Sequence, residues 1–425
     1  MRDIKTKAGE TNARPSLSRR SVLKLTAAGA LGAGALITTN ATHARREQPP
    51  TPGIVNDVGT LKVKDVQAYV VPGACYVQIT ASNGVSGWGE TDADNPPVMG
   101  AFVNHGLKQE VIGESVWDGE RLWDMMFYKN HDLGPGGGLA NSIAGVDMAL
   151  WDLKGKLLGL PVYQLLGGMY RDRVRAYGSF GISFGKTHTP DEAAAQAVKL
   201  IRQGFTAIKL RMQIREYRQN PDPDPTLLYA RAVRHAIGPD IDFWVDINGG
   251  YNASRAIEMA KRLKKEFNVM FFEEPVSDQT HTETAAVVRA VDMPVIMGEK
   301  EYTRWQEREL IIYGNPDILN PDPIKAGGLT EMKKIAAIAQ AYGKPIMCHN
   351  TRPTLSTAAA LHFCASIPNC GPLLEFVDLD SDKYRHLPGY MKNNVRFENG
   401  YLHVPQGPGL GLEVNEEKIR GAAKA

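Results

Sequence analysis

The sequence FWVDIN, at residues 243–248, contains the pattern that decides the fold of this 425-residue chain. A short apolar run is followed at once by Asp246 and Asn248, as expected for a buried strand with polar residues at its carboxyl end. Similar runs recur along the chain, and each ends in a polar residue. In chain order these residues are Lys209, Asp246, Glu273, Glu299, Asp322, His349 and Glu375. Their intervals of 37, 27, 26, 23, 27 and 26 residues are each long enough for a strand, a helix and their connections.

This repeat predicts an α/β protein in which parallel strands alternate with helices. An open doubly wound sheet would have the same rhythm, but it does not normally place a polar residue at the end of so many successive strands. A closed barrel does, because its functional residues gather at the carboxyl ends of its strands. We therefore predict a barrel over residues 173–382.

The residues on either side of this barrel have different patterns. Apolar residues alternate with others in two segments, 61–71 and 76–81, which predicts antiparallel strands. Over residues 97–166 the apolar spacing becomes three to four, which predicts helices. We interpret residues 61–172 as an α+β domain, and residues 383–425 as a segment that returns to this domain.

The first 44 residues resemble a twin-arginine export signal. Residues 18–24 read SRRSVLK, and the weakly apolar run of 13 residues that follows is too short to span a membrane as a helix. There is no acidic residue between Asn12 and Ala44. We interpret residues 1–44 as a twin-arginine signal peptide and residues 45–60 as a linker. The mature protein is then expected in the periplasm, without a stable membrane anchor after cleavage.

The net charge of the whole chain does not describe the mature protein, because the predicted signal peptide, residues 1–44, is basic. The chain has 49 lysine and arginine residues against 47 aspartate and glutamate residues. Seven of the basic and two of the acidic residues belong to this signal peptide, which leaves 42 against 45. Because this balance does not support a phosphate-binding surface, nucleic acid is not expected as a partner. The four cysteines lack zinc-site spacing and are interpreted as small buried residues.

Three of the strand-end residues, Asp246, Glu273 and Glu299, are acidic and end consecutive strands. In a shared cavity their carboxylates would repel one another unless a cation neutralised them. Any one of them alone could be a solvated strand end, but three in register indicate a metal site. Oxygen ligands, with positions left for water or substrate, favour Mg²⁺, one per subunit.

The other strand-end residues indicate acid–base chemistry. Lys209 and Arg211 lie two residues apart on one strand, so both side chains are expected to point into the barrel mouth. Asp322 and His349 end consecutive strands, where the carboxylate can hold and charge the imidazole of a general acid–base. A lone histidine here would more often be structural, but this one lies opposite the cationic strand. Glu375 is either an ionised acid or a protonated hydrogen-bond donor, and we favour the donor.

The same residues form a recognisable pattern: the chain resembles the mandelate racemase subgroup of the enolase superfamily over nearly all of the predicted mature sequence. The motifs that support the resemblance are AGVDMALWDLKGKLLGLPVYQLLGG at 144–168, IKLR at 208–211, DIN at 246–248, FEEP at 272–275, GE at 298–299, DPIKAGG at 322–328, His349, and LE at 374–375. Several of these motifs are individually weak, but their joint order and spacing are highly specific.

The resemblance implies an α+β capping domain on a modified TIM barrel, (β/α)₇β. It implies that Asp246, Glu273 and Glu299 hold Mg²⁺. It further implies that Asp322 and His349 form the catalytic dyad and that Glu375 is the hydrogen-bond donor. The shared reaction step in this superfamily is removal of the proton next to a carboxylate, by a lysine or histidine base.

One position departs from the racemase pattern. Residue 211 is arginine where the racemases have a second lysine, and a guanidinium is a poor base. Racemisation with two bases is therefore less favoured, whereas a single base, His349, suffices for dehydration. The resemblance favours an acid-sugar dehydratase, a lyase that converts an aldonate or aldarate to a 2-keto-3-deoxy acid. Two alternatives stay open: a racemase or epimerase, and an exported binding protein without turnover.

The expected ligand is a small-molecule carboxylate. Candidate substrate contacts are Asn248, on the strand of Asp246, Lys300, directly after Glu299, and His131. His131 belongs to a glycine-rich segment at residues 128–138, which we expect to form a loop over the substrate. Because relatives in the family are commonly symmetric oligomers, a homo-oligomer is expected.

Overall fold

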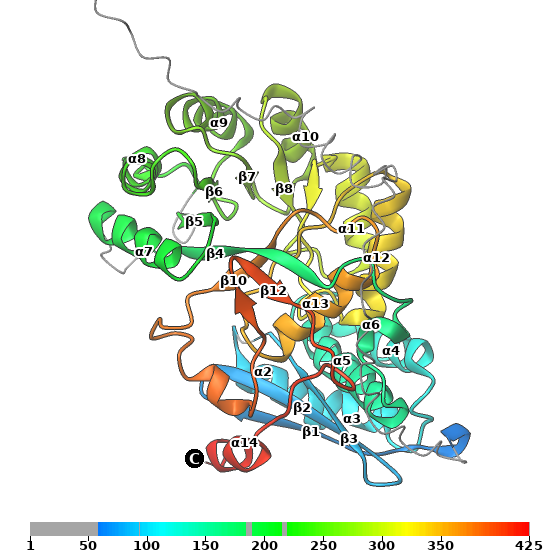
Figure 1. The fold of residues 1–425 in the computed structure, drawn as a ribbon. Coiled ribbons are helices and arrows are strands. Elements are labelled where there is room, and N and C mark those ends of the chain that lie inside the picture. The colour runs from blue at the N-terminus through cyan, green and yellow to red at the C-terminus, as the bar shows by residue number, and fades with distance from the viewer. Residues whose placement is uncertain (1–57, 93, 184–188, 215–218, 425) are drawn as a thin grey trace, which may run out of the picture.

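Parallel strands form a closed ring in the computed structural model, which describes residues 58–92, 94–183, 189–214 and 219–424. The named strands of the ring are β4 (Arg173–Ser183), β5 (Ala207–Gln213), β6 (Asp242–Asp246), β7 (Phe272–Glu273), β8 (Val295–Met297), β9 (Ile318–Leu319) and β10 (Leu374–Val377). Each pairs with the next from β4 to β9, and β10 pairs with β4. The predicted α/β barrel is confirmed (Figure 1).

The segment before His349 is shorter than the sequence predicts. The apolar run that ends at His349 predicts a strand, but the structure has only single bridges there, from Ile346 to Leu319 of β9 and to Cys370. The ladder cannot extend toward the N-terminus because Pro345 has no amide hydrogen. The ring is thus completed by a minimal seventh segment that ends next to His349.

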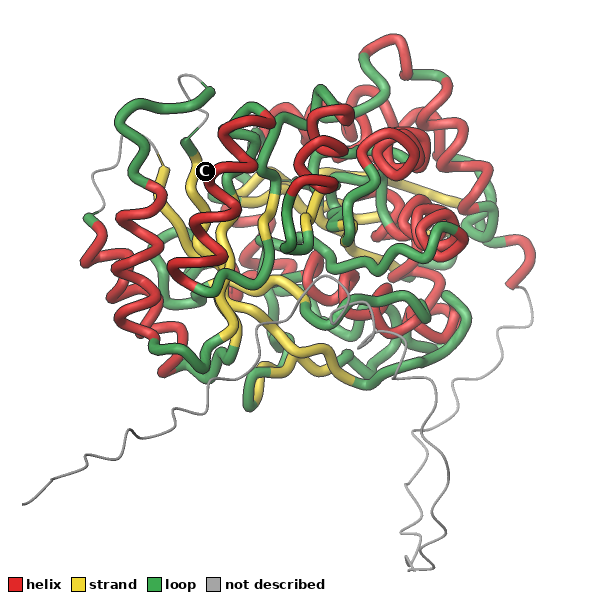
Figure 2. The backbone as a smooth tube through the Cα atoms, turned by 90° about the horizontal axis from the view of Figure 1, so that it is seen from above, coloured by secondary structure: helices red, strands yellow, loops and turns green. Residues whose placement is uncertain are grey.

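Helices cover the outside of the ring (Figure 2). They are α7 (Pro190–Arg202), α8 (Thr226–Ile237), α9 (Ala253–Phe267), α10 (His281–Ala290), α11 (Arg304–Glu309), η4 (Leu310–Gly314), α12 (Leu329–Ala341) and α13 (Leu355–Ser366). Local sequence sets several boundaries. Thr189 and Glu192 form a capping box at the start of α7, and the side chain of Asn252 caps α9. Asn268, in the left-handed conformation, ends α9.

A separate antiparallel sheet lies beside the barrel and is made of β1 (Val63–Val71), β2 (Ala74–Ala81) and β3 (Ser86–Glu90). The helical elements of this capping domain are η1 (Val58–Thr60), α2 (Pro96–Ala101), η2 (Phe102–Leu107), α3 (Lys108–Val111), α4 (Gly119–Tyr128), η3 (His131–Leu133), α5 (Gly138–Leu158) and α6 (Val162–Leu165). Helix α5 packs directly on β3. Side chains at Gly87 or Gly89 would prevent this, because a Cβ at Gly89 would lie 2.1 Å from the Gly145 carbonyl oxygen.

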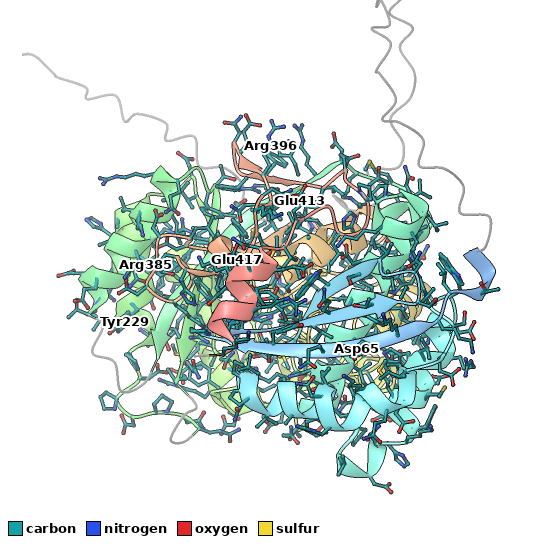
Figure 3. All side chains as sticks on the ribbon, turned by 90° about the horizontal axis from the view of Figure 1, so that it is seen from below. Asp65, Tyr229, Arg385, Arg396, Glu413 and Glu417 are labelled. Atoms are coloured by element: carbon teal, nitrogen blue, oxygen red, sulfur yellow. The ribbon has the colours of Figure 1, made fainter. Side chains whose placement is uncertain are left out.

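The segment after the barrel contacts both domains. It contains η5 (Leu387–Tyr390), β11 (Phe397–Glu398), β12 (Tyr401–His403) and α14 (Glu416–Ala422). Strand β12 pairs antiparallel with β4 of the barrel. Helix α14, which includes Glu417, packs against β1, the strand of Asp65 (Figure 3). Residues 383–425 were expected to return to the capping domain, and they also extend the barrel sheet.

The predicted signal peptide, residues 1–44, and most of the linker at residues 45–60 lie outside the described residues. Within the part of the chain that is described, no helix has both the length and the apolar character that crossing a membrane requires.

Two buried carboxylates of the capping domain bind the N-termini of barrel helices. Glu90, at the end of β3, accepts hydrogen bonds from the Ser356 amide (3.0 Å) and the Thr354 hydroxyl (2.7 Å) at the start of α13. Asp147, on α5, accepts one from the Thr330 amide (3.0 Å) at the start of α12. Amides in the first turn of a helix lack intrahelical partners and favour a negative charge. These carboxylates therefore fix the capping domain on the two helices that follow Asp322 and His349.

The Glu90 contact predicts a pH-dependent stability. Burial raises the pKa of Glu90 to about 7, although the hydrogen bonds from Ser356 and Thr354 lower it. The unfolded residue loses its proton near its ordinary pKa of 4.5, so stability is lost as the pH rises from there through the folded value. The native chain should lose about 3 kcal/mol of unfolding free energy from this group between pH 4.5 and pH 8. Glu90→Gln has no such group, so its stability relative to the native chain should rise by the same amount over this range. Urea unfolding at both pH values measures this change, with Glu417→Gln as the exposed control; parallel pH profiles would contradict it.

Candidate metal and acid–base site

The three predicted acids converge at the carboxyl ends of adjacent strands. Asp246 ends β6, Glu273 ends β7, and Glu299 follows β8 after a turn at Gly298. All three are buried, and one carboxylate oxygen from each lies within 4.8 Å of the others. Asp246 and Glu273 are register partners across β6 and β7, which explains their proximity.

The hydrogen bonds around these acids orient them without satisfying every oxygen. Asp246 Oδ1 accepts from the backbone amide of Asn248 (2.7 Å), while Asp246 Oδ2 is buried and has no hydrogen-bond partner among the described residues. Glu273 accepts from Trp244 Nε1 (3.0 Å) and from Asn320 Nδ2 (3.2 Å). A buried carboxylate oxygen without a partner, in a set of donors that is all oxygen, fits a hard divalent cation such as Mg²⁺.

The pKa values of the three acids show that ionising them together in the protein interior is unfavourable. Burial raises the pKa of Glu273 to about 8 and also raises that of Asp246, despite the opposing charge of Lys209. Burial acts on Glu299 in the same direction, but His349 and Lys300 outweigh it and hold the pKa of this carboxyl well below its usual range. The cluster therefore depends on cations for its ionisation.

Lys209 supplies one of these cations. Its Nζ is buried 2.7 Å from Glu273 Oε1, 3.1 Å from Glu375 Oε1 and 3.8 Å from Asp246 Oδ2. Burial lowers its pKa, but the Glu273 and Glu375 carboxylates raise it well above the ordinary value, so the ammonium stays charged. Arg211 is the register partner of Asp246 across β5 and β6, and its charge lowers the pKa of that acid.

Asp322 and His349 form the expected pair. His349 Nδ1 lies 2.6 Å from Asp322 Oδ2, and both side chains are buried. The other ring nitrogen, Nε2, faces the acid cluster at 3.2 Å from Glu299 Oε2. Burial lowers the pKa of His349, but Glu299 and Glu375 outweigh it and raise the value to about 9. One nitrogen is thus held by a carboxylate while the other points to the candidate metal site.

Glu375 lies between the cation and the imidazole. Its Oε2 accepts from the Asn350 amide (3.1 Å) and is 3.6 Å from His349 Nε2. Burial raises its pKa, but Lys209 and His349 lower it below the ordinary value. Of the two alternatives that the sequence left open, this arrangement favours the ionised acid over the protonated donor that we had preferred.

The three candidate substrate contacts have different surroundings. Asn248 Nδ2 donates to Glu274 Oε2 (3.1 Å), and Lys300 forms an ion pair with the same carboxylate. Both therefore border the acid cluster. His131 is exposed, and its ring contacts only Tyr128 and Asp132 of its own turn among the described residues. The structure does not bring His131 to the cluster.

Four residues that border the cluster were not predicted. They are Trp244, Glu274, Asn320 and Lys325. Period-two alternation would have identified two of them, because Trp244 precedes Asp246 by two residues and Asn320 precedes Asp322 by two. Glu274 would not have been found this way, since its positive φ of 39° turns the chain out of the strand pattern.

Comparisons with known proteins place this geometry in context. Residues 58–167 match the mandelate racemase / muconate lactonizing enzyme N-terminal domain, and residues 192–418 match the enolase C-terminal domain-like family. The chain is 30% identical to a D-galactarolactone cycloisomerase of Agrobacterium fabrum, over 81% of this chain and 89% of that protein. It is also 30% identical to a D-galactonate dehydratase of Ralstonia pickettii, over 84% and 94%.

A solved structure agrees over most of its length. The mandelate racemase/muconate lactonizing protein from Paracoccus denitrificans, crystallised as a complex with magnesium, aligns with a TM-score of 0.77 at 30% identity. The alignment covers 85% of this chain and 98% of that one.

The acid cluster predicts metal binding that depends on each of its members. We expect the native chain to bind one Mg²⁺. Glu299→Gln or Asp246→Asn should each weaken the affinity more than about 100-fold, which exceeds the loss expected when a residue that only hydrogen-bonds to a metal ligand is replaced. Isothermal titration calorimetry measures the affinity. Glu258→Gln, an exposed change on α9, is the matched control and should bind as the native chain does. Equal affinities for all four proteins would contradict the assignment.

Proposed function

The chain belongs to the mandelate racemase/muconate lactonizing enzyme family of the enolase superfamily, and from this premise we propose that it dehydrates an acid sugar to a 2-keto-3-deoxy acid. The observation that carries the proposal is the position of His349. Its Nε2 lies 3.2 Å from Glu299 of the acid cluster while Asp322 holds Nδ1, and the second barrel strand has arginine, a poor base, at position 211.

Asp246, Glu273 and Glu299 would hold Mg²⁺ in this proposal. A bound Mg²⁺ would supply a Lewis acid that stabilises negative charge on the substrate carboxylate and offsets the carboxylate charge that raises the His349 pKa. Lys209 stays protonated and adds a second positive charge on the same side of the site.

His349 removes the proton from the carbon next to the carboxylate. The proton goes to Nε2, and Asp322 stabilises the resulting imidazolium through Nδ1. The electron pair left on carbon forms a double bond to the neighbouring carbon as the β-hydroxyl leaves. The imidazolium returns its proton to this hydroxyl, so that water departs, and the enol product tautomerises to the 2-keto-3-deoxy acid.

Arg211 is the reason to favour dehydration over racemisation. A racemase needs a second base on the opposite face of the substrate, and a guanidinium is a poor base. One base is enough for elimination, because it acts first on the α-proton and then on the leaving group. The similarity to a D-galactonate dehydratase supports the same choice. A binding protein without turnover would have no need of the Asp322–His349 pair.

The dehydratase proposal is tested with a panel of aldonates and aldarates in the presence of Mg²⁺. We expect a 2-keto-3-deoxy product from at least one acid, and a rate about 100- to 10,000-fold lower for His349→Asn, the typical contribution of a general base. His235→Asn, on the exposed face of α8, is the control and should retain full activity.

Deuterated water separates this proposal from the alternatives. Solvent deuterium in recovered acid with inverted configuration, without loss of water, would identify a racemase or epimerase. Ligand binding without any exchange of the α-proton would identify a binding protein. Either result would contradict the dehydratase.

We also propose that the protein is exported by the twin-arginine route, on the basis of Arg19 and Arg20 before a weakly apolar run. Replacing both residues by lysine should retain the precursor in the cytoplasm, whereas the native sequence should deliver a chain cut after Ala44 to the periplasm. Cell fractionation with mass spectrometry of the N-terminus measures both. Equal distribution of the two proteins would contradict the proposal.

A further inference from the structure

We propose that Asp92 and Arg352 form the subsite for the end of the substrate that is farthest from its reacting carboxylate, and that this end has hydroxyl groups instead of a second carboxylate. The inference rests on the proposed function and refines it, because it names aldonates over aldarates as the substrate class.

The two residues meet where the capping domain covers the mouth of the barrel. Asp92 follows β3, and Arg352 lies three residues after His349, in the loop before α13. Both are buried, with exposed fractions of 4% and 5%. Each domain thus contributes one member of an oppositely charged pair.

The two side chains are too far apart to hydrogen-bond to each other. Arg352 Nη2 lies 3.6 Å from Asp92 Oδ1, which is longer than a hydrogen bond. Arg352 Nε is buried and has no hydrogen-bond partner among the described residues. Leaving such a donor unpaired in the interior costs about 1–3 kcal/mol, and more for a charged group. A built-in guanidinium with an unused donor indicates that a ligand completes the arrangement.

Lys325 connects this pair to the acid cluster. Its Nζ lies 3.7 Å from Glu299 Oε1. Burial raises the pKa of Asp92, and the positive charge of Lys325 lowers it. This effect of Lys325 is larger than that of Arg352. Lys325 therefore lies beside a candidate metal ligand, and its charge also acts on Asp92. We therefore assign the far end of a substrate whose carboxylate is at the metal site to Asp92 and Arg352.

The charge of the pair selects the chemistry of that end. A hydroxyl group can donate to the Asp92 carboxylate and accept from the Arg352 guanidinium at the same time. A substrate carboxylate could accept from Arg352, but it has no proton to donate to Asp92. It would therefore lie next to the buried negative charge of Asp92. Like charges in a buried site repel strongly, so a diacid is disfavoured. The geometry points to a neutral polyhydroxyl end.

The experiment compares aldonates with the aldarates of the same configuration. We expect the native enzyme with Mg²⁺ to prefer the aldonate by at least about 10-fold in kcat/KM, the value of one well-placed charge interaction. Asp92→Asn should lose about 10-fold on the aldonate and shift the aldonate-to-aldarate ratio toward the diacid. Arg352→Gln should lose activity on both, and Arg352→Lys should recover part of it. Asp94→Asn is the matched control: this exposed carboxylate lies 4.0 Å from the same guanidinium, and its loss should change the ratio less than twofold.

Binding provides a second measurement that does not depend on turnover. His349→Asn, loaded with Mg²⁺, is titrated with both acids by calorimetry, alone and combined with Asp92→Asn. A native preference for the aldarate, or an unchanged ratio in Asp92→Asn that folds and binds metal normally, would overturn the subsite while the dehydratase stands. If no acid sugar binds or is converted, both proposals fail.

Discussion

The site is organised by the repulsion among three carboxylates that are buried within 4.8 Å of one another. Ionised acids at this separation in a protein interior require compensating cations. The chain supplies Lys209 beside Glu273, and Lys300 and Lys325 beside Glu299. No hydrogen bond to Asp246 Oδ2 comes from the part of the chain that the structure describes. The lysines thus reduce the cost of burying the carboxylates but leave carboxylate oxygens free to bind a metal ion. A divalent ion held by these oxygens can still bind a further ligand.

The parts of the site that could be predicted from sequence are those fixed by strand periodicity. Asp246, Glu273 and Glu299 end consecutive parallel strands, so their meeting at one rim follows from the spacing of the repeats alone. The pairing of Asp322 with His349 follows from the same rule, even though the strand before His349 is reduced to single bridges.

Loop positions and protonation states did not follow from the sequence. His131 bonds only to Tyr128 and Asp132 of its own turn among the described residues, so its position relative to the acids did not follow from its place in the sequence. The lowered pKa of Glu375 depends on the position of Lys209 and on the Asn350 backbone amide, neither of which composition encodes. Asp92 and Arg352 belong to different domains, and no local pattern relates them.

The segment after the barrel has a consequence for how the molecule is made. Strand β12 pairs with β4, the first strand of the barrel, and α14 packs on β1, the first strand of the capping sheet. Domains tend to fold in the order in which they leave the ribosome. Here both early-made sheets have an uncovered edge or face until their last partners have been synthesised. The native structure therefore cannot be completed before residues 401–422 have been synthesised. Until then, the exposed sheet edges are the part of the chain that needs protection from wrong pairing.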